Sequence, residues 1–208
     1  MKIGVLISGH GSNLQSLINA QFEGRLSAEI VTVISNVPNV KGLERAAACG
    51  IPHQVINHKN FDESQDFDEA LNKALILANA NFICLAGFMR ILGNDFISNW
   101  LNRIINIHPS LLPSFKGLHT HERVLKAGVC FTGCTIHFVS PAVDEGPIIL
   151  QAVVPTLPND TAEILSNRVL QQEHVIYPLA VRMIAEGRVK VVGNKVKVKD
   201  ANFEGTSI

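Results

Sequence analysis

The chain has 208 residues, of which 47% are hydrophobic and 17% are charged, and its 18 basic residues balance its 18 acidic ones. This composition excludes a disordered chain, and the zero net charge gives no electrostatic argument for a nucleic-acid or acidic-membrane partner. The length predicts one domain, or one domain with a small appendage.

Apolar runs of strand length alternate with segments of helical period in the first half of the chain. We expect strands over residues 2–7, 30–34, 55–56, 82–85 and 103–108. Helices are expected between them, over residues 14–22 with Gly24 as the C-cap, over 43–49, and from 62 to 78. This alternation is typical of parallel strands joined by crossover helices.

The second half of the chain has a different pattern. It predicts a helix over residues 119–126 and strands over 132–139 and 148–154. The segment Asp160–Glu163 has the pattern of a capping box and opens a long helix, which Pro178 should kink or interrupt. Gly193 and Asn194 predict the turn of a hairpin between residues 189–192 and 195–198.

These elements predict an α/β fold with a doubly wound, mostly parallel central sheet flanked by helices. We expect residues 1–192 to form the main domain and residues 193–208 a C-terminal hairpin or tail of the same domain. The four cysteines show no paired spacing, and the longest apolar region, residues 74–89, is shorter than the ~20 residues of a membrane span. A cytoplasmic chain that does not enter a membrane is therefore expected.

In doubly wound folds, ligands bind beyond the carboxyl ends of the strands. The first such junction, residues 8–13, contains two glycines and opens a helix, so Gly11, Ser12 and Asn13 are suited to bind a phosphate. Leu14 replaces the third glycine of a dinucleotide fingerprint, which favours a mononucleotide or sugar phosphate over a nicotinamide cofactor. The alternative is a glycine-rich turn in which Ser12 only caps the helix.

The second junction carries an amide and an imidazole on one side of a strand. Asn106 and His108 are two positions apart, so both side chains point the same way and can stabilise an oxygen that becomes negative during addition to a carbonyl. An imidazole can also move protons near neutral pH. Otherwise, His108 is a structural histidine that is hydrogen-bonded at a strand end.

A third junction, residues 140–147, offers Asp144 or Glu145 as a carboxylate that could hold the imidazole of His108 in place. The alternative is a turn aspartate that bonds its own backbone. The segment 87–92, apolar apart from one charge, is equally consistent with a pocket for a flat heterocycle and with ordinary packing. His119 and His121 lack a cysteine pair at zinc spacing, so no metal is expected.

Five segments of the chain closely resemble one family. They are residues 8–14 (SGHGSNL), 85–92 (LAGFMRIL), 106–113 (NIHPSLLP), 117–121 (GLHTH) and 133–139 (GCTIHFV), followed by Asp144. The family is that of the phosphoribosylglycinamide formyltransferases, the folate-dependent enzymes of purine synthesis. The resemblance runs from the start of the chain to about residue 191.

This resemblance implies transfer of a formyl group from 10-formyltetrahydrofolate, a cosubstrate and not a tightly bound cofactor, to the amine of glycinamide ribonucleotide. Gly11, Ser12 and Asn13 would bind the phosphate, and Glu173 the ribose hydroxyls. The folate would contact Met89, Arg90, Ile91, Leu92, Asn106, Val139, Ser140 and Val143.

The resemblance also implies that Asn106, His108 and Asp144 are the catalytic residues. Asn106 and protonated His108 would stabilise the oxyanion, and Asp144 would support the imidazolium. No metal, nucleic acid or membrane is implied, and we expect a monomer or weak homodimer. The sequence departs from the family at Ser64, where relatives can carry an arginine for the glutamate tail of the folate, and at Lys116, where a proline is frequent.

Several alternatives remain at this point. A methionyl-tRNA formyltransferase would carry an added RNA-binding domain and a basic surface, and a formyltetrahydrofolate hydrolase would carry a regulatory domain. A non-enzymatic sugar-phosphate-binding module would need only the first loop. A nicotinamide-dependent reductase would bind its cofactor in a simple titration.

Overall fold

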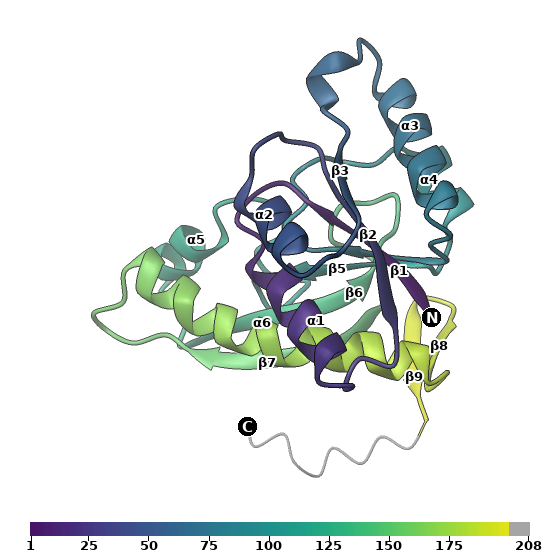
Figure 1. Ribbon diagram of the computed structural model, residues 1–208. Helices are drawn as coiled ribbons and strands as arrows, with labels where there is room; N and C mark the ends of the chain where they lie inside the picture. Colours follow the sequence, from purple (N-terminus) through teal and green to yellow (C-terminus); the bar gives the residue numbers. More distant parts are fainter. Residues whose placement is uncertain (200–208) are drawn as a thin grey trace.

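The computed structural model describes residues 1–199; residues 200–208, the end of the predicted C-terminal tail, lie outside the described residues. Seven strands form one central sheet in the order β3-β2-β1-β4-β5-β6-β7 (Figure 1). Their bounds are Lys2–Ile7 (β1), Glu29–Ser35 (β2), His53–Val55 (β3), Phe82–Leu85 (β4), Ile104–His108 (β5), Phe131–Phe138 (β6) and Ile148–Pro155 (β7). The predicted strands are therefore confirmed, with small shifts at their ends.

Strand direction confirms the doubly wound, mostly parallel sheet. β1 pairs in parallel with β2 and β4, β2 with β3, and β4 with β5, whereas β5–β6 and β6–β7 are antiparallel. The chain places β2 on one side of β1 and β4 on the other, so the strand order reverses at β1. The carboxyl end of β1 lies at this reversal, where doubly wound folds bind their ligands.

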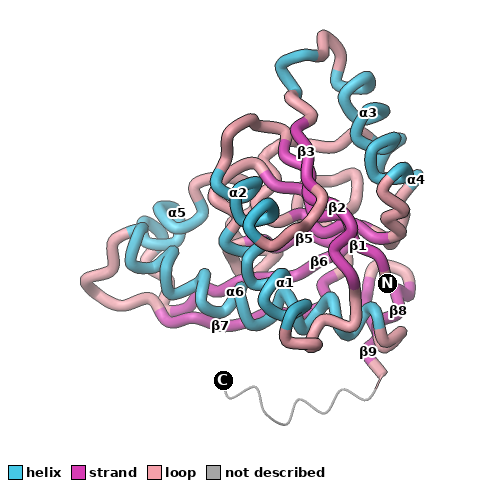
Figure 2. The backbone as a smooth tube through the Cα atoms, in the orientation of Figure 1, coloured by secondary structure: helices cyan, strands magenta, loops and turns pink. Residues whose placement is uncertain are grey.

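Helices cover both faces of the sheet (Figure 2). On one face lie α1 (Ser12–Phe22), α2 (Lys41–Ala48), α5 (Thr120–Ala127) and α6 (Ala162–Ala185), and on the other lie α3 (Ser64–Leu77) and α4 (Asn94–Asn99). Side chains of β1 alternate between the two apolar cores, with Ile3, Val5 and Ile7 in the first and Leu6 in the second. A core on each face is what a parallel sheet requires.

The same alternation positions two polar side chains of β5. Ile105 and Ile107 pack in the first core, so Ile104, Asn106 and His108 point to the opposite face. Ile104 belongs to the core beneath α3 and α4. Asn106 and His108, nearer the carboxyl end of the strand, contact polar groups instead.

Four local features differ from the sequence-based expectations. The short helix α4 and the 3-10 turn η1 (His58–Asn60) were not expected, because such short segments show no helical period. The N-cap of α6 is Thr161, since the carboxylate of Asp160 is occupied by Arg168 at 2.7 Å and by the backbone N–H of Leu157. Pro178 lies within α6 and does not interrupt it.

The expectation that Gly24 is the C-cap of α1 is wrong by one residue: the C-cap is Glu23, and Gly24 follows it in the left-handed region, with φ 70°. A second, two-stranded sheet near the C-terminus is the predicted hairpin. It consists of β8 (Val189–Val192) and β9 (Lys195–Val198), with Gly193 in the turn at φ 60°. The expected division between residues 192 and 193 thus falls in this turn. Among residues 1–199, no helix is both long and apolar enough to cross a membrane.

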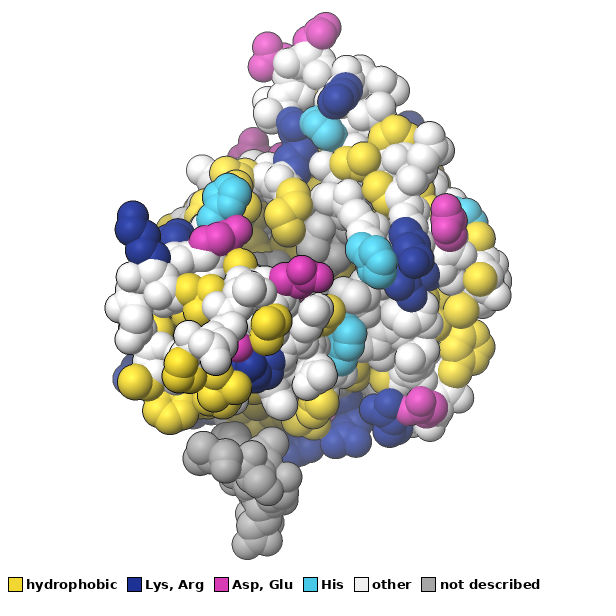
Figure 3. All heavy atoms as spheres, turned by 90° about the vertical axis from the view of Figure 1, so that its left-hand side faces the viewer, with side chains coloured by type: hydrophobic (Ala, Val, Ile, Leu, Met, Phe, Trp, Pro, Cys, Tyr) yellow, Lys and Arg dark blue, Asp and Glu magenta, His cyan; other side chains and the backbone are white. Residues whose placement is uncertain are grey.

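Charge is mixed on the surface shown in Figure 3. Basic, acidic, histidine and hydrophobic side chains alternate there, and neither sign of charge forms a continuous patch across that view. This agrees with the zero net charge of the sequence.

Candidate active site

The loop after β1 is shaped to bind an anion. Gly11 is the N-cap of α1 and lies in the left-handed region, with φ 73°, so the first backbone N–H groups of the helix have no intrahelical acceptor. A Cβ on Gly11 would lie 2.6 Å from the Cα of Gly42, which explains the need for glycine. The N-cap is Gly11, so Ser12 does not cap the helix.

Arg45 of α2 holds this loop from outside. Its Nε donates to the carbonyl of His10 at 3.0 Å, and a second guanidinium nitrogen donates to the side chain of Gln15 at 3.0 Å. These bonds fix the loop backbone and place a positive charge beside it. Both effects favour an anionic ligand.

Asn13 and Glu173 meet in space although 160 positions separate them. The Nδ2 of Asn13 donates to Oε2 of Glu173 at 2.6 Å. The side-chain oxygen of Asn13 is buried and has no hydrogen-bond partner within the described residues. A ligand hydroxyl would satisfy it. The structure therefore brings together the four residues expected to bind the phosphate and ribose: Gly11, Ser12, Asn13 and Glu173.

Glu173 is buried, and this burial raises the pKa of its carboxyl, while the hydrogen bond from Asn13 lowers it less strongly. A carboxyl whose pKa is raised by folding binds its proton more tightly in the folded state than in the unfolded state. The free energy of unfolding therefore falls as the pH rises above the pKa of the unfolded state. We therefore expect Glu173→Gln to raise the Tm at pH 7 by a few degrees, since ~1 kcal/mol corresponds to about 2–4 °C in a domain of this size.

Thermal unfolding of the variant and the unmodified protein, at pH 7 and at about pH 4, measures this effect. The difference should shrink at the lower pH, where the carboxyl is protonated in both states. Glu69→Gln, at an exposed position of α3, is the control and should leave the Tm unchanged. A Tm that falls at pH 7 would contradict the expectation.

The carboxylate of Asp144 lies between two histidines at the carboxyl end of β5. Oδ2 of Asp144 lies 3.4 Å from Nδ1 of His108, and its Oδ1 lies 3.7 Å from Nε2 of His137. Oδ2 also accepts the backbone N–H of Gly117 at 2.9 Å. Nδ2 of Asn106 is 3.2 Å from Nε2 of His137, its partner in the β5–β6 pair. The structure thus gathers Asn106, His108 and Asp144 at one place.

The ring of His108 faces an oxygen acceptor at each nitrogen. Nε2 lies 3.0 Å from the carbonyl oxygen of Phe115, and Nδ1 faces Asp144. Only the protonated imidazolium can donate at both nitrogens. The side chain is buried, and the Phe115 carbonyl lies directly against Nε2.

His137 is the residue of this cluster to which the sequence assigned no role. Burial lowers the pKa of His137, which favours its neutral form. Its Nδ1 donates to the carbonyl of Phe138 at 2.9 Å, so its Nε2 accepts from Asn106. This bond fixes the orientation of the Asn106 amide. The signal in the sequence was His137 on a predicted strand, but the register that pairs it with Asn106 was not visible.

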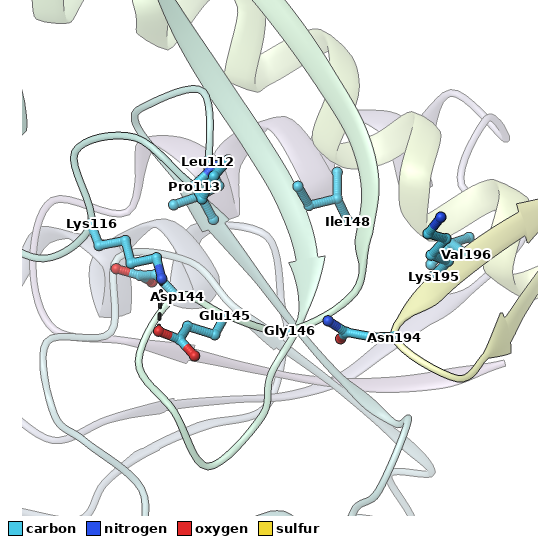
Figure 4. A pocket seen from close by; sticks show the side chains of 10 residues that line it. All are labelled: Leu112, Pro113, Lys116, Asp144, Glu145, Gly146, Ile148, Asn194, Lys195 and Val196. Atoms are coloured by element: carbon cyan, nitrogen blue, oxygen red, sulfur yellow. Dashed lines mark hydrogen bonds and ion pairs between the residues drawn. The ribbon is translucent and has the colours of Figure 1, made fainter.

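The loop of residues 139–147 folds over this face of β5 and β6. Asp144 adopts a left-handed conformation, with φ 55°, and points to the histidines. Glu145 turns away and binds Lys116, with Oε1 2.7 Å from Nζ (Figure 4). Asp144, not Glu145, therefore faces His108. A cavity of about 570 Å³ lies between these residues and residues 194–196 of the C-terminal hairpin.

Apart from Asn106 on β5, the residues expected to bind the folate lie in two segments that meet at the second core. Phe88 and Leu92 are buried in this core, and Val139 packs against it. Met89 and Ile91, between the first two, are 69% and 74% exposed, and Val143 on the other segment is 52% exposed. In the same region, Ser140 donates its hydroxyl proton to the carbonyl of Ala142 at 3.0 Å, and Arg90 points toward α3. Apolar side chains are thus exposed on both segments.

The residues considered for a metal site are not assembled. His119 is exposed and lies 3.9 Å from Glu122, whereas Cys134 is fully buried in the first core. In the part of the chain that the structure describes, no group of three or more histidine, cysteine, aspartate or glutamate side chains is arranged to hold a metal ion.

Comparisons with known proteins agree with this geometry. A model of the formyl transferase family matches residues 1–181. The trifunctional purine biosynthetic protein adenosine-3 of Gallus gallus is 50% identical over 191 residues, which cover 92% of this chain. The chain spans only 19% of the length of that relative.

Two further relatives are of similar length to this chain. Phosphoribosylglycinamide formyltransferase of Haemophilus influenzae is 44% identical over 193 residues, covering 93% of this chain and 91% of that protein. The crystal structure of glycinamide ribonucleotide transformylase 1 from Symbiobacterium toebii has a TM-score of 0.94 at 45% identity, covering 95% of this chain and 93% of that one.

Proposed function

Because the chain belongs to the formyl transferase family, we propose that it transfers the formyl group of 10-formyltetrahydrofolate to the amine of glycinamide ribonucleotide. The products are formylglycinamide ribonucleotide and tetrahydrofolate. The observation that carries this proposal is the cluster in which Asp144 contacts His108 while Asn106 lies beside them, close to a loop suited to a phosphate.

The ribonucleotide binds at the reversal of strand order. Its phosphate is held by the backbone N–H groups of Gly11, Ser12 and Asn13 and by the hydroxyl of Ser12. Glu173 and the unpartnered oxygen of Asn13 bind the ribose hydroxyls. The folate lies against Met89–Leu92 and residues 139–143, where apolar side chains are exposed. Neither substrate is a resident cofactor.

The reaction is a direct transfer between the two bound molecules. The amine nitrogen attacks the formyl carbon, and the carbonyl oxygen becomes an oxyanion that Asn106 and protonated His108 stabilise through N–H donors. The bond between the formyl carbon and N10 then breaks, with its electron pair going to N10. N10 gains a proton, and the attacking amine loses one. Asp144 keeps the imidazolium oriented and charged during these steps.

His108 takes part only when the loop of residues 113–119 shifts. In the absence of substrate the carbonyl of Phe115 accepts from Nε2, the nitrogen that would donate to the oxyanion. Substrate binding exchanges this acceptor for the developing oxyanion. Asn106 needs no such change, since one N–H of its amide bonds His137 and the other is available to a ligand.

Mixing the pure protein with 10-formyltetrahydrofolate, with and without glycinamide ribonucleotide, tests the proposal. We expect release of tetrahydrofolate only when the ribonucleotide is present, together with one formylated ribonucleotide per folate consumed. Release without the ribonucleotide would indicate a hydrolase, and no release in either mixture would overturn the transferase assignment.

Ser12→Ala should weaken ribonucleotide binding without slowing the chemical step. A hydrogen bond to a charged phosphate is lost, so we expect the KM for the ribonucleotide to rise about tenfold or more, with kcat changed less than about twofold. Steady-state kinetics at saturating folate measure both constants. Ser98→Ala, at an exposed position of α4, is the control. A fall in kcat at unchanged KM would contradict the role assigned to Ser12.

We further propose that the protein works in the cytoplasm as a monomer or weak homodimer and binds no nucleic acid. The zero net charge and the four free cysteines support this proposal. Residues 1–192 are proposed as the formyltransferase domain, with residues 193–208 as the hairpin and tail of the same domain. Sedimentation equilibrium over a range of protein concentrations would measure the oligomeric state.

A further inference from the structure

Residues 87–93, the segment after β4, combine buried and exposed apolar side chains. Phe88 and Leu92 are 8% and 5% exposed, whereas Met89 and Ile91 are 69% and 74% exposed. The two buried side chains anchor the segment in the core beneath α3 and α4. Between them, the backbone is presented at the surface, where the proposed function places the folate. The fit of a flat ring against such a backbone depends on how firmly its ends are held.

The first end is held by Ser8 of the loop after β1. The Oγ of Ser8 accepts the backbone N–H of Met89 at 2.8 Å and donates its proton to Oδ1 of Asn36 at 2.6 Å. The backbone N–H of Ser8 donates to the carbonyl of Gly87 at 3.1 Å. Asn36 is 4% exposed, so the hydroxyl is fixed by a buried partner. Ser8 therefore links the loop proposed for the phosphate to the segment proposed for the folate.

The second end is held by Asp68 of α3. Its Oδ2 accepts the backbone N–H of Gly93 at 2.7 Å. A Cβ on Gly93 would lie 2.7 Å from this oxygen, so backbone and carboxylate are in direct contact. Arg90, within the segment, is directed to the same helix. Its guanidinium lies 4.7 Å from the ring centre of Phe67, and it donates to the hydroxyl of Ser64 at 3.1 Å.

The environment of Asp68 argues against a role in stability alone. The residue is 7% exposed, and its Oδ1 is buried without a hydrogen-bond partner among residues 1–199. Burial raises the pKa of the carboxyl, against smaller opposing effects of the Gly93 hydrogen bond and of Arg90. A buried carboxylate with an unpartnered oxygen costs stability that an apolar side chain in the same core would not. What the carboxylate of Asp68 provides in return is the hydrogen bond that fixes the backbone of Gly93.

We propose that Ser8 and Asp68 are positioning residues for the folate, which act by fixing the backbone N–H groups of Met89 and Gly93 at the two ends of one segment. Neither residue touches the reacting atoms. This inference rests on the proposed function, because it assigns the segment to the folate. It adds two side chains outside the expected folate contacts: Ser8 from the loop after β1 and Asp68 from α3.

Kinetics of three variants test the inference. Asp68→Ala should raise the KM for 10-formyltetrahydrofolate about fivefold or more, with kcat and the KM for the ribonucleotide changed less than about twofold. Asp68→Asn should restore most of the affinity, because its side-chain oxygen still accepts from Gly93. Ser8→Ala should raise the same KM. Asp66→Ala, at an exposed position of the same helix, is the matched control.

Hydrogen exchange of the backbone amides, without ligand, measures the positioning directly. Asp68→Ala should speed exchange over residues 89–93 and leave the strands of the central sheet unchanged. A folate KM equal to that of the unmodified protein in both Asp68→Ala and Ser8→Ala overturns the proposal, whatever the exchange shows. So does an equal rise in the two substrate KM values for Asp68→Ala, which indicates general loosening. If Asp68→Ala does not fold, Ser8→Ala alone is judged by these criteria, and Asp68→Asn should keep a folate KM close to that of the unmodified protein.

Failure of the proposed function is a separate result. If the unmodified protein transfers no formyl group, the dissociation constant of tetrahydrofolate replaces the KM, and the same variants should raise it about fivefold or more. An unmodified protein that binds no reduced folate at all would overturn both proposals.

Discussion

Replacing His108 by alanine is expected to lower kcat by about 10³-fold, because a positioned acid–base and oxyanion-stabilising group contributes about 10²–10⁴-fold to a transfer reaction. The KM for the ribonucleotide should change less than about threefold, since the phosphate and ribose are proposed to bind to a different loop and to α6. Steady-state and single-turnover rates of tetrahydrofolate release measure the loss.

A matched histidine distinguishes this effect from a general disturbance. His53 of β3 is exposed, and its Nδ1 lies 3.0 Å from the carbonyl oxygen of Ile51. His53→Ala should keep kcat within about twofold of the unmodified protein. If His108→Ala retains more than about a tenth of the normal kcat, the imidazole is not the oxyanion-stabilising group that the geometry indicates.

Asp144→Asn should lower kcat by about 10²-fold or more, with ribonucleotide binding nearly unchanged. The carboxylate lies within 3.4 Å of His108 and 3.7 Å of His137, so the amide would replace a charge that supports the imidazolium. Asparagine tolerates the left-handed conformation at this position, where φ is 55°, so the loop backbone should keep its shape. The loss then reports the charge and not the fold.

The neighbouring Glu145 gives the control. It pairs with Lys116 at 2.7 Å and faces the cavity, so Glu145→Gln should change kcat less than about threefold. Circular dichroism and the Tm of both variants establish that they are folded. An Asp144→Asn protein that is as active as Glu145→Gln would mean that the carboxylate does not support His108.

The fold and half of the site could be predicted because they depend on local patterns. Alternation of apolar runs defined the strands, and spacing by two placed Asn106 and His108 on one face. The loop after β6 offered both Asp144 and Glu145 as the carboxylate beside His108, and only the resemblance to a family selected Asp144. The meeting of Asn13 with Glu173 was expected only from that resemblance. Contacts over 36 and 160 positions leave no periodic signal in one sequence.

The remaining contacts could not be predicted because they depend on strand register and on loop conformation. His137 bonds Asn106 only because β6 is antiparallel to β5 in one particular register. Phe115 reaches His108 through its backbone carbonyl, which every residue carries, so its identity gives no signal. The same is true of Gly93, whose backbone N–H bonds Asp68.

The contacts of His108 and His137 also affect how well this cluster could bind a transition metal. Two imidazoles and a carboxylate are a common ligand set for zinc and iron, but a ring nitrogen binds a cation only through an unshared electron pair. Nε2 of His108 lies against the carbonyl oxygen of Phe115 and its Nδ1 faces Asp144, while the electron pair on Nε2 of His137 is engaged by the amide of Asn106. Contacts that occupy the ring nitrogens in this way make both rings poor ligands for a shared metal ion.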